Sequence, residues 1–445
     1  MQNKAWKFCQ VFGERAALED INQADKINTV KFSNDGLYIS VGDYGGRCII
    51  FRRANRSSTE SRRPTAEYSY YTEFQSHEPQ FDYLRSEDIE EKINDIVWLP
   101  EQPNQQMMLT TNEKIIKLWQ VSQRSVKTVS TNMHSEVRMR TRIPEHTTSP
   151  SLRLPTLTPV KNVVMANSKR VFASGHIHHI NSLSLCPDQE HYLSADDLRI
   201  NLWNLSVTDE VFQIVDLQPS DLEQLSEIIT TCEAHPVNSS LFAYATTRGS
   251  VRLIDTRQRA LHDSPALNFD TPSAQDNFFS EVMHHIGSIK FLKDKTSDQF
   301  VTRDYFSVKL WDVRQPQKPI RSISVHEHLR PRLLELYENE ALFDRFKLVT
   351  SASGSHFLTG SYNNVFHIYD SNGTVDTAIE ASRSLPKRGR RSSKRTRNLM
   401  QHSHIDFNKK IIHCDWHPTE DTIAIATLSN LFIYSAIGSS SSSSK

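Results

Sequence analysis

The chain has 445 residues, 37% of them hydrophobic and 23% charged, and its 52 basic and 52 acidic side chains cancel, so no global field favours nucleic acid or a membrane surface. It contains no apolar run of the roughly 18 residues that span a bilayer, no secretory signal at its N-terminus and no CxxC pair among its five cysteines. We therefore expect a soluble protein of the cytoplasm and nucleus with reduced thiols.

Seven similar segments recur along the chain. Each has small or hydroxyl-bearing residues, a polar turn and then alternating apolar and polar residues. In chain order they lie at 41–51, 110–121, 194–205, 246–257, 302–314, 360–370 and 427–435. Alternation with a period of two indicates a strand with one face in a core. Turn residues such as Gly46 and Asn363 tolerate the positive φ of a tight hairpin, so each segment is predicted to be a β-hairpin.

A further strand-like stretch precedes each hairpin, as in INTVKF, INDIVW and IGSIKF. Three strands and a less regular outer strand make one blade of a β-propeller, and propellers have four to eight blades. The endings LWN and LWD, and the GH in SGHIHHINSL, are similar to the signature of WD repeats. We predict an all-β, seven-bladed WD-repeat propeller over 1–438 and a disordered tail at 439–445.

The spacing between these hairpins exceeds the roughly 40 to 45 residues of a standard repeat, so insertions are expected. The candidates are 52–92, 122–170, 205–227, 314–345 and 371–408. Long loops on a regular scaffold are where binding residues concentrate. We therefore expect the insertions, and not the blades, to carry the function.

Two insertions have the periodicity of short amphipathic helices. In 205–227, Ser220 and Glu223 have the spacing of a capping box, with leucines at helical intervals after it. In 329–346, apolar residues recur on helical faces among several acids. Each helix either packs on the propeller with a solvated charged face, or offers an apolar and acidic shelf to a basic partner. The sequence leaves both readings open.

The insertion 371–408 contains the basic run RSLPKRGRRSSKRTR at 383–397, which has no periodicity and no apolar anchors. It is predicted to be a flexible loop. A nuclear localisation signal and a plain solvated loop are both compatible with it. Nucleic-acid binding is less favoured, because no aromatic residues interleave with the basic ones to stack on bases.

Nothing in the sequence indicates catalysis. His176, His178 and His179 form a cluster, but no acidic residue or cysteine stands at metal-ligand spacing from them, which favours a structural role. Ser, His and Asp recur in every predicted blade, where they ordinarily connect strands by hydrogen bonds. The chain has no P-loop, GxGxxG or HExxH motif. We predict no catalytic residue, no metal and no cofactor.

Several motifs in the insertions are more specific than the repeats. They are GDYGGRCIIF, EYSYYTEFQSHEPQFDYL, SADDLRINLW, LYENEALFDRF and HIDFNKKIIHCDWHP. Together, over about 6–434, they resemble the B (55 kDa class) regulatory subunit family of protein phosphatase 2A. This resemblance implies a non-catalytic member of a heterotrimer. Such a protein binds the HEAT-repeat scaffold of the holoenzyme, recruits phosphoprotein substrates to its catalytic subunit, and so sets substrate specificity and localisation.

The resemblance implies a first binding surface on an extended β-hairpin arm, which leaves the propeller and grips the scaffold. Here the arm would span 66–91. Aromatic side chains are frequent interface hot spots, and this many of them in a free loop would form a sticky patch. The expected scaffold-binding residues are Tyr68, Tyr70, Tyr71, Phe74, His77, Glu78, Pro79, Phe81, Tyr83 and Leu84.

The second implied surface is an acidic top face, where the family holds substrates and inhibitor proteins. The family's substrate contacts correspond to Asp197, Leu225, Tyr337, Glu338, Glu340, Phe343 and Arg345, with Asp196 and Leu222 adjacent. A basic helical segment of a substrate would pair with the acids and place apolar side chains on Leu225 and Phe343. Gln23 replaces an acidic residue common in the family, so substrate preference is expected to differ while scaffold binding persists.

Two other functions remain open at this stage. The chain would be a general WD-repeat adaptor if it assembled with a different complex. It would be a propeller hydrolase if ligands converged at the central channel, but the sequence offers no such ligands.

Overall fold

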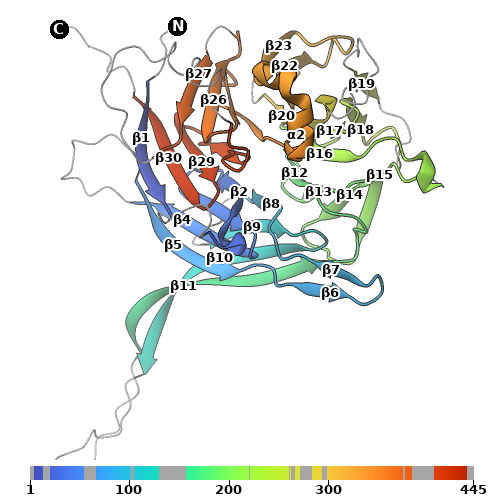
Figure 1. Cartoon of the computed structure of the whole chain (residues 1–445). Coiled ribbons are helices and arrows are strands. Elements are labelled where there is room, and N and C mark those ends of the chain that lie inside the picture. Colours follow the sequence, from blue (N-terminus) through green and yellow to red (C-terminus); the bar gives the residue numbers. More distant parts are fainter. Residues whose placement is uncertain are drawn as a thin grey trace, which may run out of the picture.

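A computed structural model of the chain shows seven four-stranded antiparallel sheets arranged as a ring (Figure 1). The structure describes residues 5–13, 21–54, 67–100, 102, 105–129, 157–219, 221–259, 261, 266–270, 283–292, 298–373, 376–382 and 405–437. The innermost strands of consecutive sheets contact one another all the way round. Among the described residues, no helix is long and apolar enough to cross a membrane.

The first three sheets, which we call blades 1 to 3, follow one another along the chain. Blade 1 consists of β2 (Ile27–Phe32), β3 (Tyr38–Asp43), β4 (Arg47–Arg53) and β5 (Tyr68–Gln75). Blade 2 consists of β8 (Asp95–Trp98), β9 (Gln105–Thr111), β10 (Ile116–Val129) and β11 (Leu157–Phe172). Blade 3 consists of β12 (Ser182–Leu185), β13 (His191–Ala195), β14 (Arg199–Asn204) and β15 (Val211–Asp216).

The next three blades repeat the same order. Blade 4 consists of β16 (Ile229–Ala234), β17 (Leu241–Thr246), β18 (Val251–Asp255) and β19 (Leu267–Phe269). Blade 5 consists of β20 (Ile286–Phe291), β21 (Gln299–Asp304), β22 (Ser307–Asp312) and β23 (Arg321–Ser324). Blade 6 consists of β24 (Leu348–Thr350), β25 (His356–Gly360), β26 (Val365–Asp370) and β27 (Asp376–Glu380).

Blade 7 closes the ring with strands from both ends of the described chain. Its inner strands are β28 (Cys414–Trp416), β29 (Thr422–Thr427) and β30 (Asn430–Ile437), and its outer strand is β1 (Ala5–Phe12). The pairing of β1 with β30 places Ala5 opposite Ile437. The seven-bladed propeller predicted from the repeats is therefore confirmed, and each predicted hairpin forms the two middle strands of a blade.

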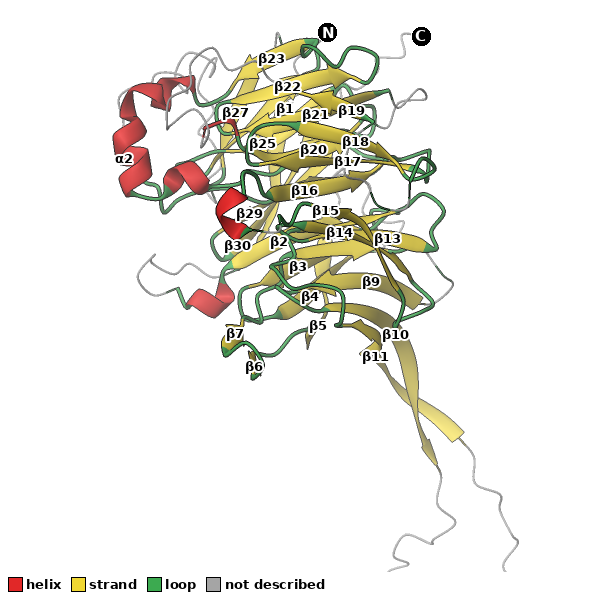
Figure 2. Cartoon of the chain, turned by 90° about the vertical axis from the view of Figure 1, so that its right-hand side faces the viewer, coloured by secondary structure: helices red, strands yellow, loops and turns green. Residues whose placement is uncertain are grey.

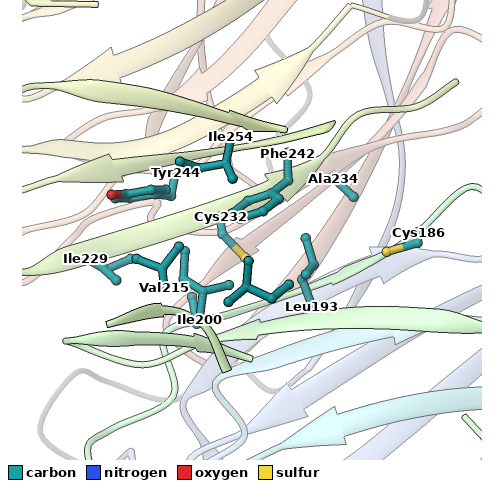
Figure 3. Packing of buried hydrophobic residues seen from close by; sticks show 12 residues of the cluster. Cys186, Leu193, Ile200, Val215, Ile229, Cys232, Ala234, Phe242, Tyr244 and Ile254 are labelled. Atoms are coloured by element: carbon teal, nitrogen blue, oxygen red, sulfur yellow. The ribbon is translucent and has the colours of Figure 1, made fainter. Parts of the chain in front are cut away.

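The core lies between neighbouring blades, where the apolar faces of two sheets meet. Figure 3 shows the cluster between blades 3 and 4, with Leu193 and Ile200 on one side and Cys232 and Phe242 on the other. A polar chain stiffens blade 3: the indole of Trp203 donates to Ser194 Oγ (2.8 Å), and His176 contacts both Ser194 (2.5 Å) and Asp196 (2.9 Å). The structural role predicted for His176 is thus confirmed.

The prediction of one extended hairpin arm over 66–91 is wrong. Its first part is β5, which pairs with β4 along its length and completes blade 1. Only the short hairpin of β6 (Gln80–Asp82) and β7 (Glu87–Ile89) projects from this segment. The reason is packing: Tyr68, Tyr71 and Phe74 of β5 reach the cores beside blade 1, so the strand gains more in the sheet than in solvent.

The long hairpin that leaves the ring lies instead within 122–170. Strands β10 and β11 stay paired from Ile116↔Phe172 out to Val129↔Leu157, and Figures 1 and 2 show them projecting well beyond blade 2. Residues 130–156, between the two strands, lie outside the described part of the chain. The ends of β10 and β11 that lie nearest the ring complete blade 2, so this segment is both the edge of a blade and a projecting arm.

The remaining insertions also contain outer strands. The predicted helix in 205–227 is reduced to the three-residue 3-10 helix η3 (Leu222–Gln224), which follows β15. The helical content of 314–345 is confirmed and lies after β23, as η4 (Glu327–Arg332), α2 (Leu333–Glu338) and η5 (Ala341–Phe343). In 371–408, β27 forms the edge of blade 6. The basic run 383–397, and Ser220 of the predicted capping box, lie outside the described residues, as does the tail 439–445.

Candidate functional site

One face of the ring carries the helical segments. Besides η3, η4, α2 and η5, it bears η2 (Gln23–Asp25), and Figure 2 shows these helices and the β6–β7 hairpin on the same side. We call it the helical face. The turns that it carries join the outer strand of one blade to the inner strand of the next, so their sequences are not constrained by a sheet.

The insertion between blades 5 and 6 is the largest described feature of the helical face. Leu329, Leu336, Leu342 and Phe346 are buried beneath it against Tyr305 and Tyr362. Its outer side exposes Tyr337 (41%) and Phe343 (54%), whose ring centroids lie 6.3 Å apart. Both roles considered for this helix, packing on the propeller and offering a shelf to a partner, are therefore present on opposite faces. The inner face packs on the propeller, and the outer face is an exposed aromatic shelf.

Polar contacts fix the insertion in place. The Tyr362 hydroxyl donates toward the Ala341 carbonyl and toward Asp344 Oδ2, each at 2.9 Å, and the Lys410 ammonium lies 2.5 Å from Asp344 Oδ1. Burial raises the pKa of Asp344, although Lys410 opposes this effect. The shelf is thus held by three bonds to blades 6 and 7, and its residues are rigid before any partner arrives.

A second chain of contacts joins this insertion to blade 3. Arg345 Nη1 donates to Asn181 Oδ1 (3.1 Å), and Asn181 Nδ2 donates to Asp197 Oδ1 (2.8 Å). Burial lowers the pKa of Arg345, while the charge of Asp197 opposes that shift. The backbone N–H of Ile229 donates to the Asp197 carbonyl (2.8 Å), which brings the end of the η3 loop to the same place. Asp197 and Arg345 are thus joined through one asparagine.

Leu225, which follows η3, is exposed on this edge. Leu222 lies in η3, and nothing is described of its side chain. Asp196 is wrongly predicted as a substrate contact: it is 0% exposed and accepts bonds from His176 and from the backbone N–H groups of Leu198 and Arg199. Adjacent residues in this turn point in opposite directions, so Asp197 faces the rim and Asp196 the blade.

The acids of the rim are available for a partner. Glu338 and Glu340 are exposed, and neither forms an ion pair within the described part of the chain. Glu335, one turn earlier in α2, is already paired with Arg332 (2.8 Å). Unpaired carboxylates beside exposed aromatic and aliphatic side chains attract a partner that carries both basic and apolar groups. We call Asp197, Leu225, Tyr337, Glu338, Glu340, Phe343 and Arg345 the acidic rim.

Four of the ten residues expected on the scaffold-binding arm pack in or against the core. The hydroxyl of buried Tyr68 donates to the Gly36 carbonyl (2.8 Å), Tyr71 packs on Tyr38 (5.5 Å between centroids) and Phe74 packs on Trp119 (4.5 Å). His77 is buried too. These four side chains pack at the edges of blades 1 and 2, which leaves no free surface on Tyr68 and His77 for a partner, whereas Tyr71 and Phe74 stay partly exposed.

The other expected residues of that segment are exposed. Tyr83 (85%) and Leu84 (98%) form the tip of the β6–β7 hairpin, and the remaining ones are Tyr70, Glu78, Pro79 and Phe81. The hairpin is anchored at its turn end, where Arg85 Nη1 donates to the Ile177 carbonyl (2.8 Å) and Lys114 pairs with Glu87 (2.8 Å). It is a small apolar tip held against the helical face.

The β10–β11 arm has an apolar surface that sequence reasoning missed. Val126, Leu157, Val160, Met165 and Val171 are exposed along it. The signal was present, because VSQRSVKTV and LTPVKNVVM are both rich in β-branched residues, on either side of a long stretch without such a pattern. A projecting hairpin with solvent-facing apolar residues is an unsatisfied surface in the isolated chain.

The central channel contains charges but no recognisable catalytic arrangement. Its lining includes Lys31, Asp95, Glu233, Lys290 and Lys347, and Lys290 pairs with Glu233 at 2.5 Å. Among the described residues, no group of three or more His, Cys, Asp or Glu side chains is placed to hold a metal ion. His179 contacts Glu113 (3.3 Å), without a third ligand in that part of the chain.

Comparison with known proteins identifies the architecture. No family model matches the chain. Among 1221 matching chains of solved structure is the crystal structure of Chaetomium thermophilum Raptor, with a TM-score of 0.55 and 11% sequence identity. The match covers 98% of this chain and 30% of that one, so this chain spans less than a third of its length. The chain is a WD-repeat-like β-propeller. At this identity the likeness extends to the propeller fold and not to function.

Proposed function

We propose that this propeller is a non-catalytic regulatory subunit of protein phosphatase 2A, of the B (55 kDa class) type. It binds the HEAT-repeat scaffold and recruits phosphoprotein substrates to the catalytic subunit. The motifs in the insertions support the family, and the acidic rim is the structural observation that carries the proposal. Glu338 and Glu340, which form no ion pair within the described residues, lie there beside the exposed rings of Tyr337 and Phe343, on an insertion bonded to blades 3, 6 and 7.

In this proposal the rim binds a short basic segment of a substrate. Lysine or arginine side chains pair with Glu338, Glu340 and Asp197, while apolar side chains settle on Leu225 and Phe343. Holding a substrate in the same assembly as the phosphatase active site raises its local concentration to the millimolar range for a short tether, about 10²- to 10⁴-fold in effect, without new chemistry. The propeller then contributes specificity while the phosphoester is hydrolysed on another chain.

Scaffold binding is reassigned in the proposal from 66–91 to the β10–β11 arm. The expected arm was an extended hairpin that leaves the propeller, and β10–β11 has that form with apolar residues along its exposed surface. The β6–β7 hairpin lies on the same face as the helices, and its tip is a candidate for a smaller contact with the substrate or with the phosphatase itself. Cytoplasmic and nuclear localisation remains part of the proposal.

Reconstitution tests this function directly. The purified full chain is mixed with the purified HEAT-repeat scaffold and the purified phosphatase, and the mixture is separated by size-exclusion chromatography. We expect one heterotrimeric peak, and faster dephosphorylation of basic phosphopeptides by the heterotrimer than by the complex that lacks the propeller. If the chain elutes separately, the phosphatase assignment fails and a WD-repeat adaptor of another complex is the better reading. Phosphoester hydrolysis by the isolated chain would contradict the non-catalytic role.

A further inference from the structure

A cavity of about 500 Å³ lies between blades 1 and 7, beside η2. This volume falls within the range of small-molecule sites, roughly 300 to 1,000 Å³. Blade 1 and the turn before it contribute Gln23, Lys26, Asn28 and Tyr44, and blade 7 and the segment before it contribute Lys410 and His413. The cavity therefore lies at a junction of two sheets that are far apart in the sequence.

The lining of the cavity favours an anion. It contains two lysines, a histidine and several amide and hydroxyl groups, and no carboxylate is among its described lining residues. Lys26 has no ion-pair partner in the described part of the chain. Lys410 pairs with Asp344 on one side (2.5 Å), which leaves further N–H groups of its ammonium for a second acceptor.

Charges around the cavity keep the balance positive. The Lys92 ammonium lies 4.8 Å from the centre of the Tyr44 ring, at the edge of the cavity. Asp344 pairs with Lys410, and Glu90 acts on Tyr44. Lys26 and Lys92 form no ion pair within the described part of the chain, so their ammonium groups remain for an anion, on a face whose rim is otherwise acidic.

His413 marks where the cavity narrows into the central channel, because it lines both. Burial and the charges of Lys347, Lys31 and Lys92 hold the pKa of His413 well below its usual range, so the ring is neutral and offers one N–H donor. The channel itself has about 40 Å³ of free space, and its lysines face Asp95, Asp415 and Glu233. An anion larger than a monatomic ion or a water molecule therefore fits the cavity but not the channel.

We propose that this cavity binds a phosphate monoester, with Lys26 and Lys410 as the cations and the His413 ring as a hydrogen-bond donor. A dianionic phosphate group suits this site better than a single carboxylate, because its oxygens can accept from several donors at once. The esterified group is either a phosphorylated side chain of a protein or a small organic phosphate, which share this chemistry. The proposal does not depend on the phosphatase assignment, since it concerns the isolated chain.

Isothermal titration calorimetry on the full chain tests the proposal. The probes are O-phosphoserine, a short phosphoserine peptide and the same peptide without phosphate. We expect saturable binding of at least one phosphorylated probe and none of the unphosphorylated peptide. Tighter binding of the phosphopeptide than of O-phosphoserine identifies a protein as the source, and equal binding identifies a small ligand. Absence of binding by both phosphorylated probes, or equal binding of the unphosphorylated peptide, overturns the proposal.

Lys26→Glu locates the site. It reverses an unpaired charge in the cavity, so it should weaken binding of the phosphorylated probe at least about tenfold. The matched control is Lys318→Glu, an exposed lysine after β22 in blade 5, which should leave binding unchanged. Thermal melting of both variants checks folding, and Lys26→Gln replaces Lys26→Glu if the reversal lowers the melting temperature. Wild-type affinity in a folded Lys26 variant overturns the assignment to this cavity.

Discussion

The hydroxyl oxygens of Tyr305 and Tyr362 lie 2.9 Å apart, although Tyr305 is in the β21–β22 turn of blade 5 and Tyr362 is in the β25–β26 turn of blade 6. Because the Tyr362 hydroxyl also reaches Ala341 and Asp344, one oxygen atom connects two blades to the insertion that carries the acidic rim. Buried polar networks of this kind rigidify a structure when every member has a partner. The geometry of the acidic rim therefore depends on Tyr362, a buried residue that is not itself part of the rim.

Replacing Tyr362 with phenylalanine should lower stability and loosen the rim. The change removes the donor to one oxygen of the largely buried Asp344 carboxylate, and one of two donors to the Ala341 carbonyl, which also accepts from the Asp344 backbone N–H. We expect this to cost about 1–3 kcal/mol of unfolding free energy. Urea denaturation measures this loss. The matched control is Tyr83→Phe, because the Tyr83 hydroxyl is on an exposed tip and its removal should change stability by less than about 0.5 kcal/mol. Equal stability of both variants would contradict the role given to the Tyr362 hydroxyl.

Among the cationic side chains of the described core, Arg303 should lower the free energy of unfolding most when it is replaced. It is buried, its guanidinium donates to the backbone carbonyls of Asp304, Tyr305 (3.1 Å) and Ser307 (3.3 Å), and it lies over the Phe346 ring. Arg303→Met keeps much of the volume and removes the donors, so we expect a loss of about 3 kcal/mol in unfolding free energy.

Arg314→Met is the control for Arg303. Arg314 is paired with Asp298, but its side chain is mostly exposed, so the pair contributes at most about 1 kcal/mol. Chemical denaturation of both variants gives the comparison. A loss for Arg303→Met no larger than that for Arg314→Met would show that the buried guanidinium is replaceable.

Stability should fall as the pH drops below 6.5, with His77 as one cause. Burial and the nearby Lys117 lower the pKa of His77 from its ordinary 6.5 to about 3 in the folded state. Between these values the unfolded chain takes up a proton that the folded chain refuses, so unfolding becomes easier by about 1.4 kcal/mol per pH unit for this group. Buried His326, whose pKa is also held well below 6.5, acts in the same direction.

His77→Gln separates this contribution from the rest. The glutamine amide can donate to the Ile115 carbonyl, which lies 3.2 Å from His77 Nε2, but it does not titrate. We expect the variant to show a shallower decline in unfolding free energy between pH 6.5 and 4, measured by urea denaturation at several pH values. An unchanged slope would mean that His77 is protonated in the folded protein as readily as in the unfolded chain.

Charge reversal on the acidic rim should reduce substrate recruitment and spare assembly. For the double variant Glu338→Lys, Glu340→Lys, we expect at least about a tenfold loss of affinity for a basic substrate peptide, measured by fluorescence anisotropy. Glu73→Lys, on the exposed side of β5, is the control with the same type of charge change. Loss of scaffold binding by the rim variant, or unchanged peptide affinity, would argue against separate substrate and scaffold surfaces.

Two pairs of substitutions decide which hairpin binds the scaffold. Leu157→Asp with Val160→Asp places charges on the exposed surface of β11, and Tyr83→Asp with Leu84→Asp does so at the β6–β7 tip. We expect the first pair to abolish recovery of the HEAT-repeat scaffold in a pull-down and the second to leave it intact. All four side chains are exposed, so thermal stability should not change. The opposite result would return scaffold binding to the segment that was first predicted.

The propeller was predictable because its hairpins are local. Each middle pair of strands is joined by a turn of a few residues, and the turns at Gly46, Asn363 and Asn364 do adopt the positive φ that their residue types suggested. The outer strands were not recognised, because they follow longer connections and are half exposed. In β15, for example, Phe212 faces solvent while Ile214 and Val215 are buried, a pattern that was absorbed into a predicted helical insertion.

The failure to locate the outer strands also explains the errors in the candidate sites. A regular strand would place Tyr68 and Tyr70 on the same face, but the β4–β5 register shifts between Ile50 and Phe51, and the structure buries Tyr68 while Tyr70 is exposed. Without the strand and its irregularity, both residues look like exposed anchors. Asp196 and Asp197 differ in the same way, since only contacts with His176 and Asn181 decide which one faces the rim. The helices over 327–343 were predicted because their apolar spacing is local.

The pairing of β1 with β30 has a consequence for synthesis of the protein. Blade 7 takes its outer strand from the start of the described chain and the other three from its end, so β1 has no partner in the sheet until β30 has been synthesised. Before then, the nascent protein is an open arc with unpaired strand edges at both of its ends, a form prone to aggregate. A nonsense mutation before Asn430 would thus remove β30 and leave the ring open although the other six blades had been made.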